Sequence, residues 1–187
     1  MAESAKPLGV VLAGGAGERL GGSKAAAELA GRPLITYPLA AFSEAGIEAI
    51  VVAKATTELP PLDVALVIEP SEPRHPLLGL VTALVHAGGR PVIACPCDTP
   101  FVTAALLTRL ATSPTTTAVH DGVRLHPLLA RYQPRDLLPL QDGLEANASA
   151  TSIAESLSPT IVTTDPRTAF NINTPEDLAE AASIGPG

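Results

Sequence analysis

The sequence has few aromatic residues and an excess of acidic over basic ones. Its 187 residues include no tryptophan, three phenylalanines and two tyrosines. Proteins that hold single-stranded nucleic acid stack bases on aromatic rings and neutralise phosphates with lysine and arginine. Here 12 basic residues stand against 19 acidic ones, which gives a net charge of −7 at pH 7. We therefore expect no nucleic-acid partner.

Cysteine and long apolar runs are equally scarce. Cys95 and Cys97 are the only cysteines; their spacing strains a mutual disulfide, and no second pair exists to complete a zinc site. We expect both to be small packed residues at a strand end. The longest uncharged apolar stretch, residues 76–89, is shorter than the roughly 20 residues that span a bilayer, and the first residues lack the pattern of a secretory signal. These absences predict a cytoplasmic protein without a membrane segment.

The composition that remains is typical of a chain with a hydrophobic core, with 46% hydrophobic and 17% charged residues. This balance excludes an intrinsically disordered chain, and the length fits one domain over residues 1–187. Apolar runs alternate with helical patterns, which indicates a mostly parallel sheet buried on both faces by helices. The predicted fold is therefore a three-layer α/β/α sandwich. Its expected strands are 10–12, 50–52, 64–68, 91–95, 116–119, 127–131 and 161–164, and its expected helices are 33–45, 77–87 and 104–110.

Two segments near the C-terminus carry different signals. Thr174, Pro175 and Asp177 predict the start of the last helix, because Thr is a good N-cap, Pro suits the first helical position and acids are favoured in the first turn. Residues 141–152 contain Gly, Asn and three Ser or Thr. This composition predicts a loop or a weakly ordered stretch.

A glycine-rich loop follows the first expected strand. Residues 12–24 read LAGGAGERLGGSK, with five glycines and the cations Arg19 and Lys24. The backbone N–H groups of such a loop can point at phosphate oxygens while the cations neutralise them. A flexible surface turn is the alternative, which five glycines directly after a buried strand disfavour. The loop therefore predicts a phosphate-binding site.

Two well-known glycine motifs do not fit this loop. The Walker pattern ends in Gly-Lys-Ser/Thr, whereas Lys24 here follows Ser23 and precedes an alanine. The dinucleotide fingerprint fails because Leu20 replaces its third glycine and because the second strand ends in Lys54 rather than an acid. The loop is thus neither an NTPase P-loop nor a Rossmann dinucleotide site.

Three polar residues follow expected strands, where ligands bind in a parallel sheet. Asp98 comes directly after the fourth strand, and one carboxylate plus phosphate oxygens is a usual Mg²⁺ site; a helix cap explains it equally well. Asn171 and Asn173 alternate on one face before the last helix. Their amides could donate to and accept from a ligand, although ordinary turn formation explains them as well.

Residues 120–127 place two His, an Arg and an Asp around a glycine. A hairpin tip explains Asp121 and Gly122 directly. The spacing does not exclude a Ser/His/Asp triad, but no Gly-x-Ser-x-Gly elbow is present, so a hydrolase has little support.

Three segments, taken together, resemble a known family. They are Leu12-Ala13-Gly14-Gly15 with Arg19, Gly21-Gly22 and Lys24; Pro96-Cys97-Asp98-Thr99-Pro100-Phe101; and Asn171-Ile172-Asn173-Thr174-Pro175-Glu176-Asp177-Leu178. The chain resembles the molybdenum cofactor guanylyltransferases over essentially its whole length, within the class of nucleotidyltransferases with a glycine-rich loop. The resemblance implies a Rossmann-like nucleotidyltransferase fold. It also implies transfer of GMP from Mg-GTP to the terminal phosphate of molybdopterin, with or without molybdenum, and release of pyrophosphate.

The resemblance also implies roles for individual residues. Arg19, Lys24 and Asp98 would be catalytic, with Asp98 holding Mg²⁺, and Asn171 and Asn173 would bind the acceptor. The nucleotide would contact Leu12, Ala13, Gly14, Gly15, Arg19, Gly22, Lys24, Gly79 and Asp98. GTP and molybdopterin are the expected partners, with transient contact to proteins of cofactor synthesis or to acceptor proteins. Residues 120–127 match a family stretch near the acceptor.

The chain departs from the family pattern at several positions. Ser23 replaces an acid before the loop lysine, Lys54 and Glu69-Pro70 stand where an Asn and an Asp are common, and His75 replaces a glycine. The loop also resembles that of the cytidylyltransferases, whereas Asn171 and Asn173 in place of two aspartates favour guanine. The alternatives are a cytidylyltransferase, another nucleotidyltransferase, or a nucleotide-binding accessory protein without turnover.

Overall fold

A seven-stranded sheet forms the middle of the molecule, in a computed structural model that describes residues 5–15, 20 and 22–185. The strand order is β5-β4-β1-β6-β8-β7-β9, and β2 and β3 form a separate antiparallel ribbon. β8 runs antiparallel to β6 and β7, while all other neighbours are parallel. The strands are β1 (Leu8–Leu12), β2 (Glu28–Leu29), β3 (Arg32–Pro33), β4 (Ala49–Lys54), β5 (Leu66–Glu69), β6 (Val92–Pro96), β7 (Thr117–His120), β8 (Leu125–Tyr132) and β9 (Thr160–Thr163).

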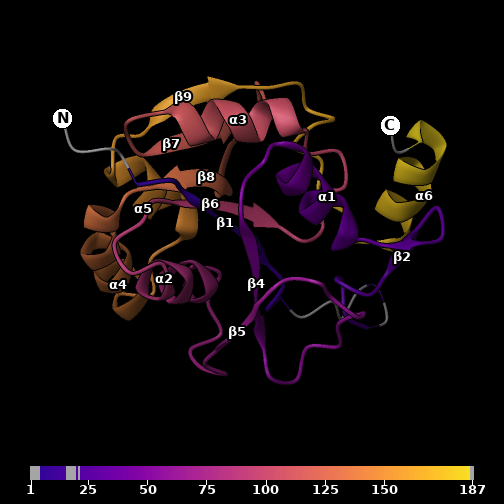
Figure 1. Cartoon of the computed structure of the whole chain (residues 1–187), viewed down its shortest axis with the longest axis horizontal. Helices are drawn as coiled ribbons and strands as arrows, with labels where there is room; N and C mark the ends of the chain where they lie inside the picture. The colour runs from indigo at the N-terminus through magenta and orange to yellow at the C-terminus, as the bar shows by residue number, and fades with distance from the viewer. Residues whose placement is uncertain (1–4, 16–19, 21, 186–187) are drawn as a thin grey trace.

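Helices cover both faces of this sheet, which confirms the predicted three-layer sandwich (Figure 1). α1 (Thr36–Glu44) and α3 (Ala104–Thr112) pack on one face. α2 (Leu77–His86), α4 (Leu137–Glu145) and α5 (Ala150–Ser156) pack on the other, with the 3₁₀ turn η2 (Pro134–Asp136) leading into α4. α6 (Pro175–Ile184) lies apart from these layers, beside β2. In the part of the chain described, no helix has both the length and the hydropathy of a membrane span.

A third apolar cluster attaches the C-terminal segment to the rest of the fold. Ile172 is fully buried beside Phe101, and Ala181 of α6 packs in the same cluster with Leu29 and Leu34. This packing holds the segment before α6 against the turn after β6. The segment that carries Asn171 and Asn173 is thereby anchored next to the residue that follows β6.

The predicted start of the last helix is confirmed. Thr174 is the N-cap of α6, Pro175 is its first residue, and the side chains of Thr174 and Asp177 form a reciprocal capping box. Cys95 and Cys97 are free and buried at the end of β6, also as predicted.

The loop predicted over residues 141–152 is wrong, because most of this segment belongs to α4 and α5. Gly143 lies inside α4, where an added Cβ would collide with Ile153 of α5, so the glycine permits close approach of the two helices. Ser149 is the N-cap of α5 and accepts a hydrogen bond from the backbone of Ser152. The residues that suggested disorder serve a helix contact and a helix cap.

Two further expectations need correction. The helix predicted over 33–45 begins only at Thr36, because Arg32 and Pro33 pair with β2. Burial on both faces holds for β1, β4 and β6 but not for the edge strands, where Leu66 and Ile161 are about half exposed. Side chains alternate between the two faces of a strand, and in β5 Val67 packs against the α2 cluster while Leu66 points to the opposite, more exposed face.

Candidate functional site

The polar residues selected from the sequence gather at the carboxyl ends of β1 and β6, which are neighbours in the sheet. The backbone N–H of Cys97 donates to the carbonyl of Leu12 at 3.0 Å, so the chain after β6 starts beside the point where the glycine-rich loop leaves β1. Ile172 donates its N–H to the carbonyl of Asp98 at 2.9 Å. Three segments far apart in the sequence therefore meet at one point.

Asp98 is the centre of this meeting point. Lys24 Nζ donates to Asp98 Oδ2 at 2.8 Å, and Asn171 Nδ2 donates to Asp98 Oδ1 at 2.9 Å. The side chain of Asp98 is only 10% exposed. A buried carboxylate is stable only when it is paired and hydrogen-bonded. Both conditions are met here by side chains from remote segments.

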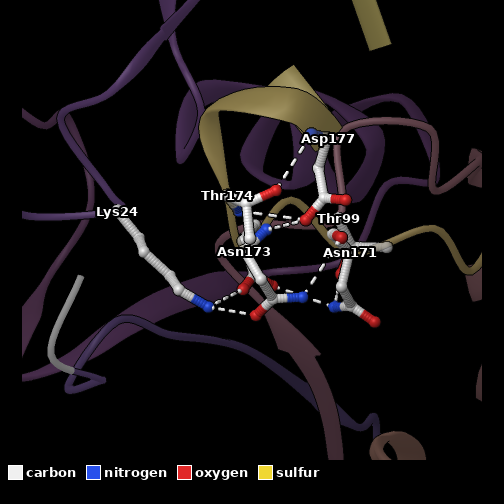
Figure 2. Close-up of polar contacts among 7 residues, drawn as sticks. Lys24, Thr99, Asn171, Asn173, Thr174 and Asp177 are labelled. Carbon is white, nitrogen blue, oxygen red and sulfur yellow. Dashed lines mark hydrogen bonds and ion pairs between the residues drawn. The ribbon is translucent and has the colours of Figure 1, made fainter. Parts of the chain in front are cut away.

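Lys24 has a second partner in the C-terminal segment (Figure 2). Its Nζ donates to Asn173 Oδ1 at 2.5 Å, and Asn173 Nδ2 donates to the carbonyl of Asn171 at 3.2 Å. The backbone N–H groups of Asn173 and Thr174 donate to Asp177 Oδ2 at 2.8 and 2.9 Å. The first of these bonds is the main reason why the pKa of Asp177 lies below its ordinary value, although desolvation opposes it.

The alternative explanation of Asp98 as a helix cap is wrong. Thr103 is the N-cap of α3, and its side chain accepts the backbone N–H of Leu106 at 3.2 Å. The Asp98 carboxylate therefore has no part in starting that helix. Its partners are the ammonium of Lys24 and the amide of Asn171.

The donor set fits a divalent ion that is shared with a substrate. Mg²⁺ is usually bound by one or two carboxylates together with phosphate oxygens and water. In the described residues, no group of three or more His, Cys, Asp or Glu could hold a metal on its own. Asp98 already faces a cation, Lys24, so its carboxylate is oriented for positive charge. The site is thus suited to a metal that arrives with phosphates.

Glu69 at the end of β5 is a further candidate, which was not among the site residues predicted from the sequence. Its carboxylate lies against Gly14 and Gly79: a Cβ on Gly14 would collide with it, and a Cβ on Gly79 would lie 2.7 Å from Oε2. Glu69 is 6% exposed. Burial raises its pKa above the ordinary value, and Lys54 partly offsets this. The sequence signal that could have identified Glu69 is its position as an acid directly after an expected strand, 64–68.

The other residues predicted to contact the nucleotide differ in their surroundings. Ala13 is buried, and its N–H donates to the carbonyl of Val52 at 2.8 Å; Leu12 is half-buried. Gly15 and Gly22 are exposed, and none of the described residues lies within 4 Å of where a Cβ would stand. Arg19 lies outside the described residues.

Two of the residues that depart from the family pattern, His75 and Lys54, form hydrogen bonds in the structure. His75 Nδ1 accepts the backbone N–H of Leu77 at 3.1 Å, and its Nε2 lies 2.9 Å from the carbonyl of Ala148, so this ring links the start of α2 to the turn between α4 and α5. Lys54 Nζ donates to the carbonyl of Ser71 at 3.1 Å. Ser23 Oγ is buried and has no hydrogen-bond partner within the described ranges.

The hairpin tip predicted at Asp121 and Gly122 is confirmed, since β7 and β8 pair up to His120 and Leu125 and Gly122 has φ +92°. The Asp121 carboxylate accepts the N–H groups of Val123 and Arg124, each at 2.8 Å, and lies 2.7 Å from His126 Nε2. Desolvation opposes ionisation, but these hydrogen bonds together hold the pKa of Asp121 well below its usual range. The polar contacts of this acid serve the turn.

Comparison with known proteins matches residues 9–160 to the MobA-like NTP transferase domain. The molybdenum cofactor guanylyltransferase of Rhizobium leguminosarum bv. trifolii (strain WSM2304) is 33% identical to this chain over 199 residues, which cover 92% of this chain and 90% of that relative. The alignment thus extends well beyond the glycine-rich loop.

Solved structures show the same fold. The molybdopterin-guanine dinucleotide biosynthesis protein A of Archaeoglobus fulgidus superposes with a TM-score of 0.75 at 21% identity, covering 95% of this chain and 97% of that one. The 2-C-methyl-D-erythritol 4-phosphate cytidylyltransferase of Thermus thermophilus superposes with a TM-score of 0.69 at 18% identity, over 96% and 98% of the two chains. The fold is therefore the α/β nucleotidyltransferase fold.

Proposed function

This chain belongs to the MobA-like NTP transferase domain family, and on that premise we propose that it transfers GMP from GTP to the terminal phosphate of molybdopterin, with or without molybdenum. The reaction would release pyrophosphate and need Mg²⁺. The observation that carries the proposal is the convergence of Lys24, Asp98 and Asn173 at the end of β1 and β6. In this proposal, a single nucleotidyltransferase domain carries all the residues that the reaction needs.

The proposed chemistry requires positioning and charge stabilisation rather than a protein nucleophile. An oxygen of the acceptor phosphate forms the new bond to the α-phosphorus of GTP, and the bond from that phosphorus to the bridging oxygen of the β-phosphate breaks. The electron pair leaves with pyrophosphate. Asp98 would hold Mg²⁺, which would supply neutralisation of the phosphate charge.

Each predicted site residue has a role in this proposal. Asp98 holds the metal, and Lys24 moves its ammonium from Asp98 to the triphosphate, with Arg19 as a second cation. Asn171 and Asn173 face the acceptor side. The remaining contacts of the nucleotide are Leu12, Ala13, Gly14, Gly15, Gly22 and Gly79. Because a lysine is a point charge on a flexible stem, it can exchange one anionic partner for another.

Cytidylyl transfer is the second candidate, since a cytidylyltransferase has the same fold. The amides of Asn171 and Asn173 favour guanine, because the resemblance to cytidylyltransferases would require aspartates there. Proteins that bind a ligand in the native state unfold at a higher temperature when it is present. Melting curves with GTP, CTP, ATP and UTP, with and without Mg²⁺, therefore test the base.

The decisive experiment compares the wild type with Asp98→Asn in this panel and then measures pyrophosphate release with molybdopterin. We expect a Mg²⁺-dependent shift selective for GTP, lost in the variant, and pyrophosphate release from the wild type alone. Selectivity for CTP would establish the second candidate. Nucleotide binding without pyrophosphate release would indicate an accessory protein, and no shift with any nucleotide would refute the proposal.

A further inference from the structure

The amide of Asn171 is already fully used as a donor. An asparagine side chain offers two N–H donors and one carbonyl acceptor. Asn171 Nδ2 donates to Asp98 Oδ1 at 2.9 Å and to Thr99 Oγ1 at 3.1 Å. A phosphate is an acceptor and would need free donors from the protein. The amide nitrogen of Asn171 is therefore directed at the Asp98 carboxylate in this structure.

Asn171 engages only Oδ1 of the Asp98 carboxylate, so Oδ2 is left to face a cation. Oδ1 accepts from Asn171, while Oδ2 accepts from Lys24 at 2.8 Å. The two bonds determine the rotation of the carboxylate, since each oxygen has its own donor. When Lys24 turns to a phosphate, Oδ2 becomes the oxygen that a metal can reach, and Oδ1 is still held.

The backbone around Asn171 is rigid enough for such a role. Ile172 is fully buried, and its N–H donates to the carbonyl of Asp98 at 2.9 Å. On the other side, Asp177 accepts the N–H groups of Asn173 and Thr174 as part of the α6 capping box. Figure 2 shows the contacts of Asp177 with Asn173 and Thr174. The segment is thus fixed at both ends relative to Asp98.

We propose that Asn171 is a positioning residue for the metal-binding carboxylate: it orients Asp98 so that Oδ2 faces the cation. This inference rests on the proposed function and revises one assignment in it, because it moves Asn171 from the acceptor side to the nucleotide half of the site, beside Asp98. Partners that orient a metal ligand typically contribute about 10- to 100-fold to metal affinity. The neutral amide suits this position, because an acid there would place a second negative charge beside Oδ1.

The test measures Mn²⁺ binding to the protein in complex with a GTP analogue that carries a methylene group between the α- and β-phosphates. Free Mn²⁺ is followed by electron paramagnetic resonance for the wild type, Asn171→Ala and Asn171→Asp. We expect Asn171→Ala to weaken Mn²⁺ binding about tenfold. Asn171→Asp should tighten Mn²⁺ binding, because a second carboxylate joins the site, and should slow pyrophosphate release.

A control separates positioning from general stability. Ser149→Ala removes the N-cap of α5 and should lower the melting temperature, but among the described residues the hydroxyl of Ser149 is hydrogen-bonded only to the backbone N–H of Ser152. It should leave Mn²⁺ affinity unchanged. Steady-state kinetics add a second readout: Asn171→Ala should raise the Mg²⁺ concentration needed for half-maximal rate and leave KM for molybdopterin unchanged.

The outcomes distinguish this inference from the proposed function. Equal Mn²⁺ affinity in all three proteins, with a raised KM for molybdopterin in Asn171→Ala, would overturn the inference and leave guanylyl transfer intact. The same loss of affinity in Ser149→Ala would also overturn it. Absence of Mn²⁺-dependent nucleotide binding in the wild type would overturn the proposed function and this inference together.

Discussion

Two acids that follow strands of the same sheet, Asp98 after β6 and Asp121 after β7, have similar surroundings but different partners. Each side chain is 10% exposed, and each carboxylate lies within 2.8 Å of a nitrogen of a basic side chain. The partners of Asp121 all lie within five residues along the chain. The partners of Asp98 are Lys24, 74 residues before it, and Asn171, 73 residues after it.

This difference supports the proposal that Asp98, rather than Asp121, is the functional acid. Asp121 accepts hydrogen bonds from the turn that it belongs to, so its contacts stabilise the hairpin. The carboxylate of Asp98 instead pairs with Lys24 from a remote segment, and this lysine can exchange it for another anion. Burial and a basic partner are common to both acids, so only the distance of the partners along the chain distinguishes them, and it favours Asp98 as the acid proposed to meet a ligand.

The largest effect is expected from Asp98→Asn. If Asp98 holds Mg²⁺, loss of its charge should lower the rate of Mg²⁺-dependent pyrophosphate release by about a thousandfold, since metal neutralisation of phosphate charge contributes several kcal/mol. The substitution keeps the side-chain volume, so the circular dichroism spectrum should be unchanged. Asp63→Asn, at an exposed position, is the matched control. Activity close to that of the wild type would refute the metal assignment.

A smaller effect is expected from Lys24→Met, which removes the ammonium but keeps much of the stem. Hydrogen bonds to charged groups contribute about 1.5–3 kcal/mol, so Mg-GTP binding measured by calorimetry should weaken roughly 10- to 100-fold. Without nucleotide, Mn²⁺ should bind Lys24→Met more tightly than the wild type, because Lys24 no longer competes for Asp98. Lys6→Met changes an exposed lysine and should alter neither constant. Unchanged GTP affinity in Lys24→Met would place the phosphates elsewhere.

Asp121→Asn tests the structural side of the comparison. The loss of the charge that accepts the N–H groups of Val123 and Arg124 should lower the free energy of unfolding by about 1 kcal/mol at pH 7, with Mg-GTP affinity unchanged. Because the folded pKa of Asp121 is depressed, its stabilising effect is present above the unfolded pKa and is lost as the pH falls toward the folded pKa. The difference from the wild type should therefore narrow below about pH 4. A loss of nucleotide binding would contradict the structural assignment.

Much of the fold was predictable because its signals are local. Apolar runs predict β1, β4 and β6, and the Thr174 cap predicts α6. The helices α4 and α5 were missed because Gly143 is a contact between helices, which composition cannot distinguish from a turn residue. Tertiary packing overrode the local preference there.

The candidate site was predictable only in its parts. Lys24, Asp98, Asn171 and Asn173 could be selected by type and by position after a strand. Their mutual contacts could not, since Lys24 and Asn173 are 149 residues apart and meet only through the buried cluster around Ile172. The helix-cap alternative for Asp98 likewise required the position of Thr103.

The smallest effect concerns a third buried acid, Glu69, which lies against two glycines and has no ion pair or hydrogen bond of its side chain among the described residues. Desolvation raises the pKa of Glu69 in the folded protein above its value near 4.5 in the unfolded chain. Ionisation of Glu69 therefore destabilises the fold, and this effect develops as the pH rises from the unfolded pKa through the folded pKa. Glu69→Gln should therefore raise the free energy of unfolding at pH 7, by less than about 1 kcal/mol, and the gain should vanish near pH 4. Urea unfolding across this pH range measures the effect, with the exposed Glu72→Gln as control. If Glu69→Gln destabilises the protein at neutral pH, the carboxylate has a stabilising partner, and Glu69 would join Asp121 on the structural side of the comparison.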